Sequence, residues 1–245
     1  MTKLFRLFVF LMIGVLTWAA YAVPDAQMFA VPEMARLIFF HLPCALSCTM
    51  FFYFGAYLSF RTIQSKSLSW DVRAASANEL GMVLAVLTMI TGIIFSKIQW
   101  GAFWSWDPRQ TSFLFVLLLY SAYFVLRSAF ADPEKRAWVS AAYALFCVLP
   151  ATFCIFVLPR IMESLHPSNT VVDGQLKGWY GWVTWSLVLF ITVFASIIYK
   201  LAVRAGLLEL KVLENYGNLE TRGGDTALTG VVRPIPVPDE GGAQS

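Results

Sequence analysis

The sequence predicts an all-α integral membrane protein with six transmembrane helices, and two observations lead to this fold class. Of the 245 residues, 58% are hydrophobic and only 13% are charged, whereas soluble domains are about 25% charged. The apolar residues also gather into runs close to the roughly 20 residues that an α-helix needs to cross a bilayer. These runs are residues 4–23, 37–60, 80–95, 112–130, 138–158 and 180–203.

The first run is either a retained membrane anchor or a secretory signal. Lys3 and Arg6 precede it, and Ala20-Tyr21-Ala22 gives the small-x-small pattern of a cleavage site. Its apolar length exceeds that of a usual signal core, which favours a retained anchor. The third run is the shortest, and it can continue into the tryptophan-rich stretch that follows it.

The connections between these runs are polar. Residues 61–79 and 131–137 are predicted to be ordinary connections, with Asp132-Pro133 as a helix-start signal. After the last run, the amphipathic residues 207–216 either extend the last helix or dock on a partner, and extension is favoured.

The rest of the chain is predicted to form a tail. Residues 217–245 are rich in Gly and Pro, have no apolar period and are predicted to be disordered. We therefore assign residues 1–204 to one transmembrane domain and residues 205–245 to a mostly disordered cytoplasmic tail.

Lysine and arginine predict the orientation, because cytoplasmic loops carry an excess of them. An even number of spans places both termini on one side, and most of the basic residues fall on that side. They are Lys3, Arg6, Arg61, Lys66, Arg73, Arg127, Lys135, Arg136, Lys200, Arg204 and Lys211, against Arg36, Lys97, Arg109, Arg160 and Lys177 on the other. The termini are therefore predicted to be cytoplasmic.

The most unusual stretch is WGAFWSWD at residues 100–107, which has three tryptophans and lies on the outer side. If it is helical, Trp100, Trp104 and Asp107 share one face, and Pro108 limits its continuation. Tryptophan is also enriched at bilayer interfaces, so an aromatic belt is the simpler interpretation.

The only two histidines, His41 and His166, are both predicted on this outer side. Haem requires axial imidazoles, a flat apolar surface and cations for its propionates. The sequence therefore predicts a haem site in which His41 and His166 are the axial ligands and Trp100, Trp104 and Trp106 provide the surface. The candidate cations are Arg36, Lys97, Arg109, Arg160 and Lys177.

Asp107 has two possible roles in such a site. It could orient a histidine as a hydrogen-bond acceptor, or it could pair with Arg109 and hold the loop, and we favour the loop-holding role.

The four cysteines are Cys44, Cys48, Cys147 and Cys154, and all lie in apolar runs. Buried cysteine behaves as a small apolar side chain, so plain packing is favoured for them. The competing metal site would hold zinc or copper on His41, Cys44 and Cys48, but it would need further ligands on that face.

The pattern Trp100-Gly101-x-x-Trp104-x-Trp106-Asp107 resembles the WWD signature of the haem-handling proteins of cytochrome c maturation. Within that superfamily, the length and the six spans look like the haem exporter protein C (CcmC) family, and residues 109–112 also look like this branch. The resemblance runs from about His41 to the last span. It implies that residues 97–111 contact haem and that His41 and His166 are axial ligands.

The resemblance further implies a carrier of haem b, held as cargo on the periplasmic side of a bacterial inner membrane, and not an enzyme. The implied partners are a membrane-anchored haem chaperone (CcmE type), ABC transporter subunits (CcmA and CcmB types) and a small membrane subunit (CcmD type). The alternatives are a CcsA-type haem channel and cytochrome c synthase subunit, a membrane b-type cytochrome, and a scaffold subunit. The sequence of residues 104–108 is also found in the CcsA type.

Overall fold

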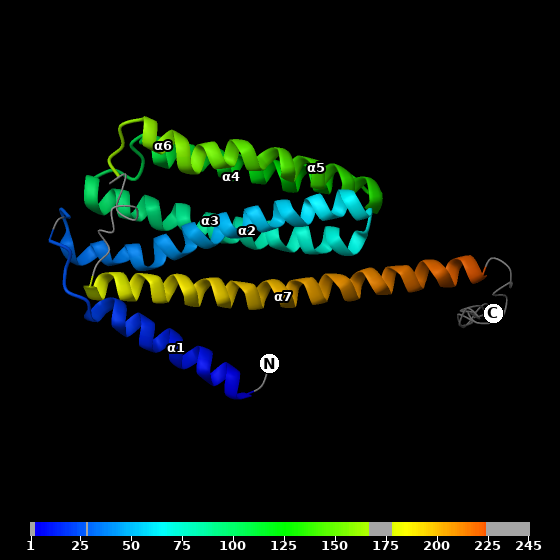
Figure 1. Ribbon diagram of the computed structural model, residues 1–245, viewed down its shortest axis with the longest axis horizontal. Coiled ribbons are helices and arrows are strands. Elements are labelled where there is room, and N and C mark those ends of the chain that lie inside the picture. Colours follow the sequence, from blue (N-terminus) through cyan, green and yellow to red (C-terminus); the bar gives the residue numbers. More distant parts are fainter. Residues whose placement is uncertain (1–2, 28, 167–177, 224–245) are drawn as a thin grey trace, which may run out of the picture.

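The computed structural model describes residues 3–27, 29–166 and 178–223, and its long elements are all helices (Figure 1). Six of the helical stretches are long and apolar enough to cross a membrane, which confirms the predicted fold class. The long helices are α1 (Lys3–Ala22), α2 (Ile38–Ser65), α3 (Leu68–Trp100), α4 (Pro108–Ser128), α5 (Pro133–Thr152) and α7 (Gly178–Gly223). Three short segments complete the described elements: the 3₁₀ helix η1 (Pro32–Leu37), the π-helical η2 (Phe153–Val157) and α6 (Leu158–Ile161).

The helices run side by side as a bundle with one outlying member. Helices α2, α3, α4 and α5 form the main body, α7 lies along α2 and α3, and α1 packs against α7 on the outside (Figure 1). The residues before α2, between α3 and α4, and after α6 all lie at one end of the bundle. The first residues of α1 and the last residues of α7 point toward the opposite end, as an even number of spans requires.

The prediction that residues 61–79 form a polar connection was wrong. Helix α2 continues to Ser65 and α3 begins at Leu68, so only Lys66 and Ser67 separate them, with Lys66 in the left-handed region at φ 52°. The physical reason is that the polar residues of this stretch find partners inside the bundle. Asp71 on α3, for example, accepts two hydrogen bonds of 2.7 Å from the Arg127 guanidinium of α4.

The other connection is shorter than residues 131–137, because α5 begins at Pro133. The predicted start signal is confirmed, since the Asp132 side chain caps this helix by accepting a 2.8 Å hydrogen bond from the backbone N–H of Lys135. The N–H groups of a first helical turn lack partners within the helix, and such a cap satisfies one of them.

Helix α7 is longer than its membrane span. The predicted extension of the last helix is confirmed, and the helix continues to Gly223, so residues 217–223 are helical where we predicted disorder. The rest of the predicted tail, residues 224–245, lies outside the described residues. At the start of this extension α7 packs closely against α3, because a Cβ added to Gly206 would lie only 2.7 Å from the side chain of Val72.

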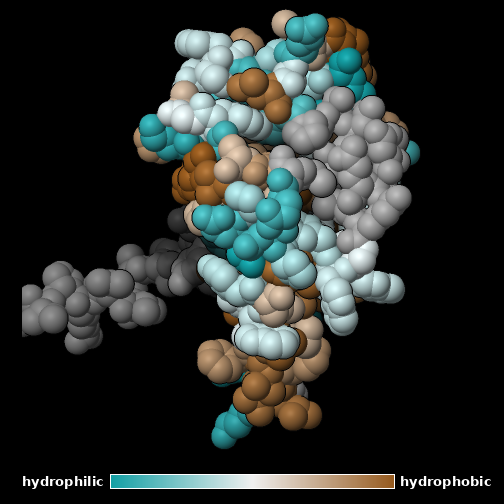
Figure 2. All heavy atoms as spheres, turned by 90° about the vertical axis from the view of Figure 1, so that its left-hand side faces the viewer, coloured by the Kyte–Doolittle hydropathy of each residue, from teal (hydrophilic) through white to brown (hydrophobic). Residues whose placement is uncertain are grey.

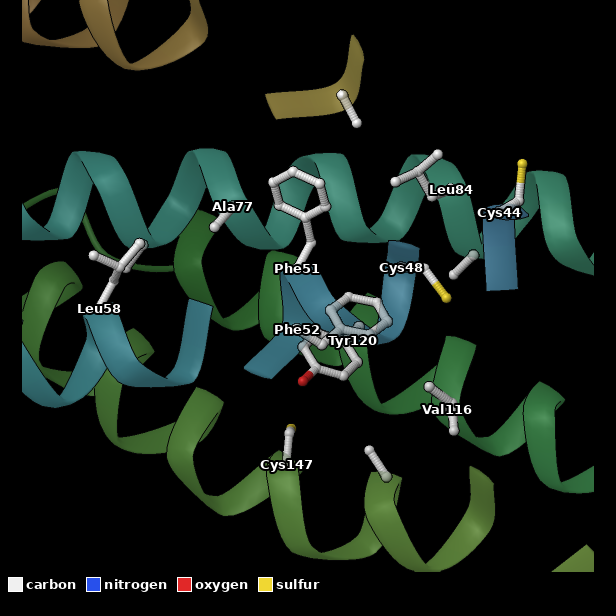
Figure 3. Packing of buried hydrophobic residues seen from close by; sticks show 14 residues of the cluster. Cys44, Cys48, Phe51, Phe52, Leu58, Ala77, Leu84, Val116, Tyr120 and Cys147 are labelled. Atoms are coloured by element: carbon white, nitrogen blue, oxygen red, sulfur yellow. The ribbon is translucent and has the colours of Figure 1, made fainter. Parts of the chain in front are cut away.

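The core is aromatic and contains most of the cysteines. Phe52 of α2 stacks on Tyr120 of α4 with ring centroids 3.6 Å apart, and Cys48 and Cys147 lie fully buried beside them (Figure 3). The prediction that cysteines pack as small apolar side chains is confirmed for Cys44, Cys48 and Cys147, which are free thiols in this cluster.

Helices α2 and α3 are in close contact at two glycines. A Cβ on Gly55 would lie 2.2 Å from the side chain of Asn78, and one on Gly81 would lie 2.8 Å from Phe52. Small residues at membrane helix interfaces permit such close packing, which stabilises association when water supplies no driving force. This tight pair of helices carries His41 and the tryptophan stretch at one end of the bundle.

Candidate functional site

The candidate site lies at the end of the bundle where three segments meet: the one before α2, the loop between α3 and α4, and the one after α6. We call them the outer segments, because the sequence predicts them on the outer side of the membrane. Seen from this end, hydrophilic residues gather over the middle of the face, and hydrophobic residues dominate its lowest part, where α1 lies (Figure 2). Gln99, near the end of α3, holds the segment before α2 through two hydrogen bonds with the backbone of Val31. It accepts from the N–H at 3.0 Å and donates to the carbonyl at 2.9 Å. The segments are thus joined by specific polar contacts.

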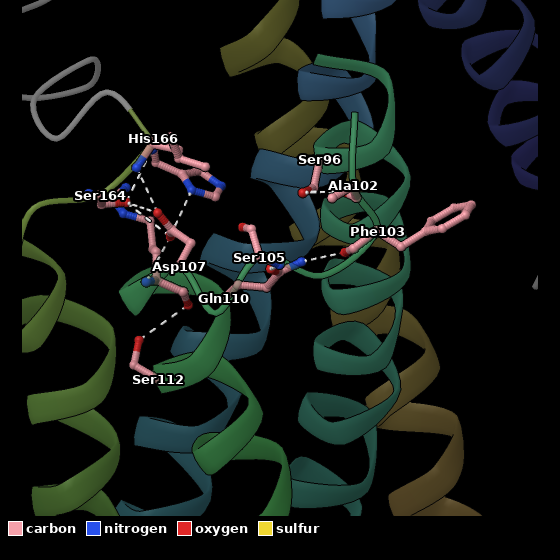
Figure 4. Close-up of polar contacts among 11 residues, drawn as sticks. Ser96, Ala102, Phe103, Ser105, Asp107, Gln110, Ser112, Ser164 and His166 are labelled. Atoms are coloured by element: carbon pink, nitrogen blue, oxygen red, sulfur yellow. Dashed lines mark hydrogen bonds and ion pairs between the residues drawn. The ribbon is translucent and has the colours of Figure 1, made fainter. Parts of the chain in front are cut away.

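The tryptophan stretch is not the helix that would place Trp100, Trp104 and Asp107 on one face. Helix α3 ends at Trp100 because Gly101 adopts a left-handed conformation at φ 83°, and an irregular loop runs from there to α4. In this loop, side chains make the hydrogen bonds to backbone carbonyls that a helix would make with its own N–H groups. Ser96 donates to the carbonyl of Ala102 at 2.8 Å, and Gln110 donates to that of Phe103 at 2.8 Å (Figure 4).

The three tryptophans consequently have different surroundings. Trp100 is half-buried and meets the His166 ring edge to face, with centroids 4.7 Å apart. Trp104 and Trp106 meet each other edge to face at 5.7 Å, and Trp106 is 74% exposed. Trp106 also has a positive φ of 56°, which a bulky residue rarely adopts.

Asp107 is the polar centre of the site. Its carboxylate caps α4 by accepting a 3.0 Å bond from the N–H of Arg109. It also accepts bonds from the Ser164 hydroxyl at 2.9 and 3.0 Å, from the N–H of Leu165 at 2.6 Å and from Nδ1 of His166 at 3.3 Å (Figure 4). Asp107 thus contacts the backbone of Arg109, the loop after α6 and the imidazole of His166, and both roles considered from the sequence stay predictions.

Burial and hydrogen bonding shift the pKa values of Asp107 and His166. Burial raises the pKa of the Asp107 carboxyl, but the bonds from Leu165, Ser164 and Arg109 outweigh it, so the pKa lies below its usual value. Burial lowers the pKa of His166, and the opposing attraction of Asp107 does not restore it. His166 is consequently neutral at neutral pH, with a proton on Nδ1 for Asp107 and a free lone pair on Nε2.

His41 lies in the first turn of α2 and faces α3. Its Nδ1 is 3.1 Å from the carbonyl oxygen of Thr88 and 3.1 Å from the hydroxyl of Thr91. A carbonyl only accepts hydrogen bonds, so Nδ1 carries the proton and Nε2 keeps its lone pair. Gly92 leaves room for this ring, since a Cβ there would lie 3.1 Å from Cε1 of His41.

The two histidines line the same cavity, which has a volume of about 180 Å³. Arg109 lines it as well, and Arg160 lies close enough to affect Arg109 electrostatically. Apolar side chains make up much of the remaining wall, among them Leu42, Ala45, Met89, Phe113, Ile155 and Pro159. Of the predicted site residues that the structure describes, this wall brings together His41, His166 and Arg109.

The other candidate cations are held elsewhere or are not described. Arg36 makes a 2.7 Å ion pair with Asp25, Lys97 donates to the carbonyl of Gly101 at 2.9 Å, and Arg160 donates to the carbonyl of Phe156. Lys177 lies outside the described residues. Among the candidate cations that the structure describes, Arg109 is the one that lines the cavity with the histidines.

Comparison with known proteins decides the family. The family model described as "CcmC: Heme exporter protein C" matches residues 1–217. The chain belongs to the haem exporter protein C family. It is 28% identical to the protein of that name from Rhodobacter capsulatus over 160 residues, which are 64% of each chain.

Two further relatives of the haem exporter protein C family bear the same name. The Paracoccus denitrificans protein is 29% identical over 120 residues, or 49% of this chain and 48% of the relative. The Haemophilus influenzae protein is 29% identical over 182 residues, or 70% of this chain and 68% of the relative. The matched part of the chain thus spans less than two thirds of the first two relatives.

The sequence alone did not reveal several residues that shape this exporter-family site. Ser164 and Gln110 hold the outer segments, and Thr88, Thr91 and Gly92 hold His41. The sequence signal for the last three was weak, since threonine and glycine are ordinary in membrane helices. Their spacing of three and four residues along α3 was the one usable signal, because it places them on one helical face.

Gly92→Ala should disturb His41. The added Cβ forces the ring to give by a few tenths of an ångström, which weakens its bonds to Thr88 and Thr91, and overpacking of this kind costs about 1–3 kcal/mol. We expect a lower melting temperature in detergent and a changed ¹⁵N resonance of His41, with that of His166 unchanged. Gly14→Ala on α1 is the matched control, because nothing lies within 4 Å of its new Cβ. Equal melting temperatures and His41 resonances in the two variants would contradict the expectation.

Proposed function

We propose that this protein binds haem b on the periplasmic side of a bacterial inner membrane and hands it to a membrane-anchored haem chaperone for cytochrome c biogenesis. The observation that carries this proposal is that the only two histidines of the chain come from distant segments and line one cavity. Each has Nδ1 turned to an acceptor of the protein, and Nε2 is therefore the nitrogen available for iron. The family name of the relatives supports haem as the ligand.

The site fits haem as a cargo that is later released. Pockets that enclose drug-sized ligands have volumes of about 300–1,000 Å³, and this cavity is smaller, so a macrocycle would be only partly enclosed. Trp100 packs against His166, which lines the cavity, and the exposed Trp106 of the same stretch offers further aromatic surface. Partial enclosure leaves part of the haem accessible to a partner.

Membership of the family supports a wider assembly. ABC transporter subunits of the CcmA and CcmB types and a small subunit of the CcmD type would act with this protein, and no covalent bond would change on it. A membrane b-type cytochrome is disfavoured because it generally needs more than one haem to carry charge across the membrane, and two histidines can supply the axial ligands of one haem only. A CcsA-type synthase would need further histidines, and the chain has only two.

The axial assignment is tested by the visible spectrum of the purified protein. We expect the wild type to show low-spin haem, oxidised and reduced, and His41→Ala with His166→Ala to lose the haem or turn it high-spin, because no imidazole is left to bind iron. Identical spectra in both proteins would show that residues other than His41 and His166 bind the iron. A wild type without haem under haem-replete conditions would favour the scaffold alternative.

The role of Arg109 is tested by combining a variant with a modified haem. Arg109→Gln should weaken haem binding about 10- to 150-fold, since a hydrogen bond to a charged group contributes about 1.5–3 kcal/mol. It should not weaken binding of haem dimethyl ester, which lacks the propionate charges. Arg36→Gln is the control at the same end of the bundle, because Arg36 pairs with Asp25. Equal losses for both forms of haem would exclude Arg109 as the propionate cation.

Delivery is tested by transfer. Haem-loaded protein in nanodiscs is mixed with the haem-free soluble domain of a CcmE-type chaperone, and the two are separated by an affinity tag. We expect the haem absorption to appear in the chaperone fraction after separation. A haem-free apocytochrome of the same size, used in place of the chaperone, should receive much less haem. Haem that stays on the membrane protein would contradict the proposed delivery.

A further inference from the structure

Asp107 makes more contacts than its position in the chain requires. A helix cap needs one hydrogen bond, as the matching Asp132 of α5 illustrates with its single bond to Lys135. Asp107 has a side chain only 2% exposed, and three further donors approach it, all from residues 164–166. Burying a carboxylate costs free energy unless it is well paired. The additional bonds therefore indicate a role directed at the segment that carries His166.

The supports of the two imidazoles are unequal. Nδ1 of His166 donates to a buried carboxylate, whereas Nδ1 of His41 donates to a neutral carbonyl with a hydroxyl beside it. A carboxylate behind an imidazole fixes the tautomer and the ring orientation and makes the free nitrogen a stronger metal ligand. A neutral carbonyl fixes the tautomer without adding negative charge. The geometry therefore favours His166 as the stronger ligand.

The orientation of His166 also depends on the tryptophan stretch. Asp107 belongs to this stretch, and Trp100, at its beginning, meets the His166 ring. The N–H of His166 is held in addition by the Ser164 hydroxyl at 3.1 Å, which itself donates to Asp107. The carboxylate thus joins the tryptophan stretch, the loop after α6 and the imidazole in one network.

We propose that Asp107 is the positioning residue of His166 and makes the two haem ligands unequal, so that the bond from His41 to iron is the one that yields first when haem leaves. This inference rests on the proposed function, in which both histidines bind haem. It assigns an order to release: the haem is held by His166 while the other axial position opens toward an incoming ligand from a partner.

The test is a double-mutant cycle on haem affinity, measured by titrating haem into haem-free protein. We expect His166→Ala to lose at least about ten times more affinity than His41→Ala. In the Asp107→Asn background this difference should disappear, because the carboxylate no longer strengthens His166. Asp132→Asn is the matched control, since it alters a helix cap in the same way without a histidine, and it should leave the difference intact.

A spectroscopic readout separates positioning from stability. Asp107→Asn should raise the midpoint potential of the bound haem, because loss of the negative charge disfavours the ferric form. Asp132→Asn removes the carboxylate of another helix cap and keeps Asp107 and both histidines, so it should leave the potential unchanged. Equal shifts in the two variants, or no shift in either, would overturn the proposal.

A measurement on the haem-free wild type covers the case in which the Asp107 variant does not fold. The ¹⁵N spectrum of its two histidines should show a proton on Nδ1 of each, with the stronger hydrogen bond at His166. A proton on Nε2 of His166 overturns the inference. If neither single histidine variant changes haem binding, the proposed function itself fails, whereas equal losses in both contradict only the unequal ligands.

Discussion

The buried carboxylate of Asp107 is the constraint on which the arrangement of the site depends. A carboxylate away from water must be hydrogen-bonded, and this one is satisfied only when α4 begins at Pro108 and residues 164–166 fold back over it. Its position in turn depends on the end of α3 at Gly101, which directs the chain into an irregular loop instead of a longer helix. Backbone strain is accepted in the same loop, since a left-handed non-glycine residue such as Trp106 costs about 1–3 kcal/mol.

The bundle beneath the site is tightly packed. Helices α2 and α3 approach each other at Gly55 and Gly81, and aromatic rings such as Phe52 and Tyr120 fill the centre. His41 therefore lies on a tightly packed helix pair, whereas His166 lies on a loop that needs Asp107 to hold it.

The candidate cations at this end of the bundle have different surroundings. Arg36 and Lys97 bind groups of the protein in the loop segments, whereas Arg109 lines the cavity. The aromatic residues differ in the same way, because Trp100 supports His166 while Trp106 faces outward. The tryptophan stretch thus contacts the cavity-lining His166 on one side and offers exposed aromatic surface on the other.

The sequence by itself determined the membrane fold, because six apolar runs of spanning length leave the backbone few alternatives to helices in a bilayer. It also determined that both histidines and the tryptophan stretch meet at one end, since an even alternation of spans places all three outer segments there. Only the tertiary structure decided the shape of residues 100–107, the length of the helices around residues 61–79, and the partners of Asp107. Those features depend on hydrogen bonds between residues far apart in the sequence, such as Asp71 with Arg127 or Asp107 with Ser164. The spacing of residues along the chain does not predict which of them form such bonds.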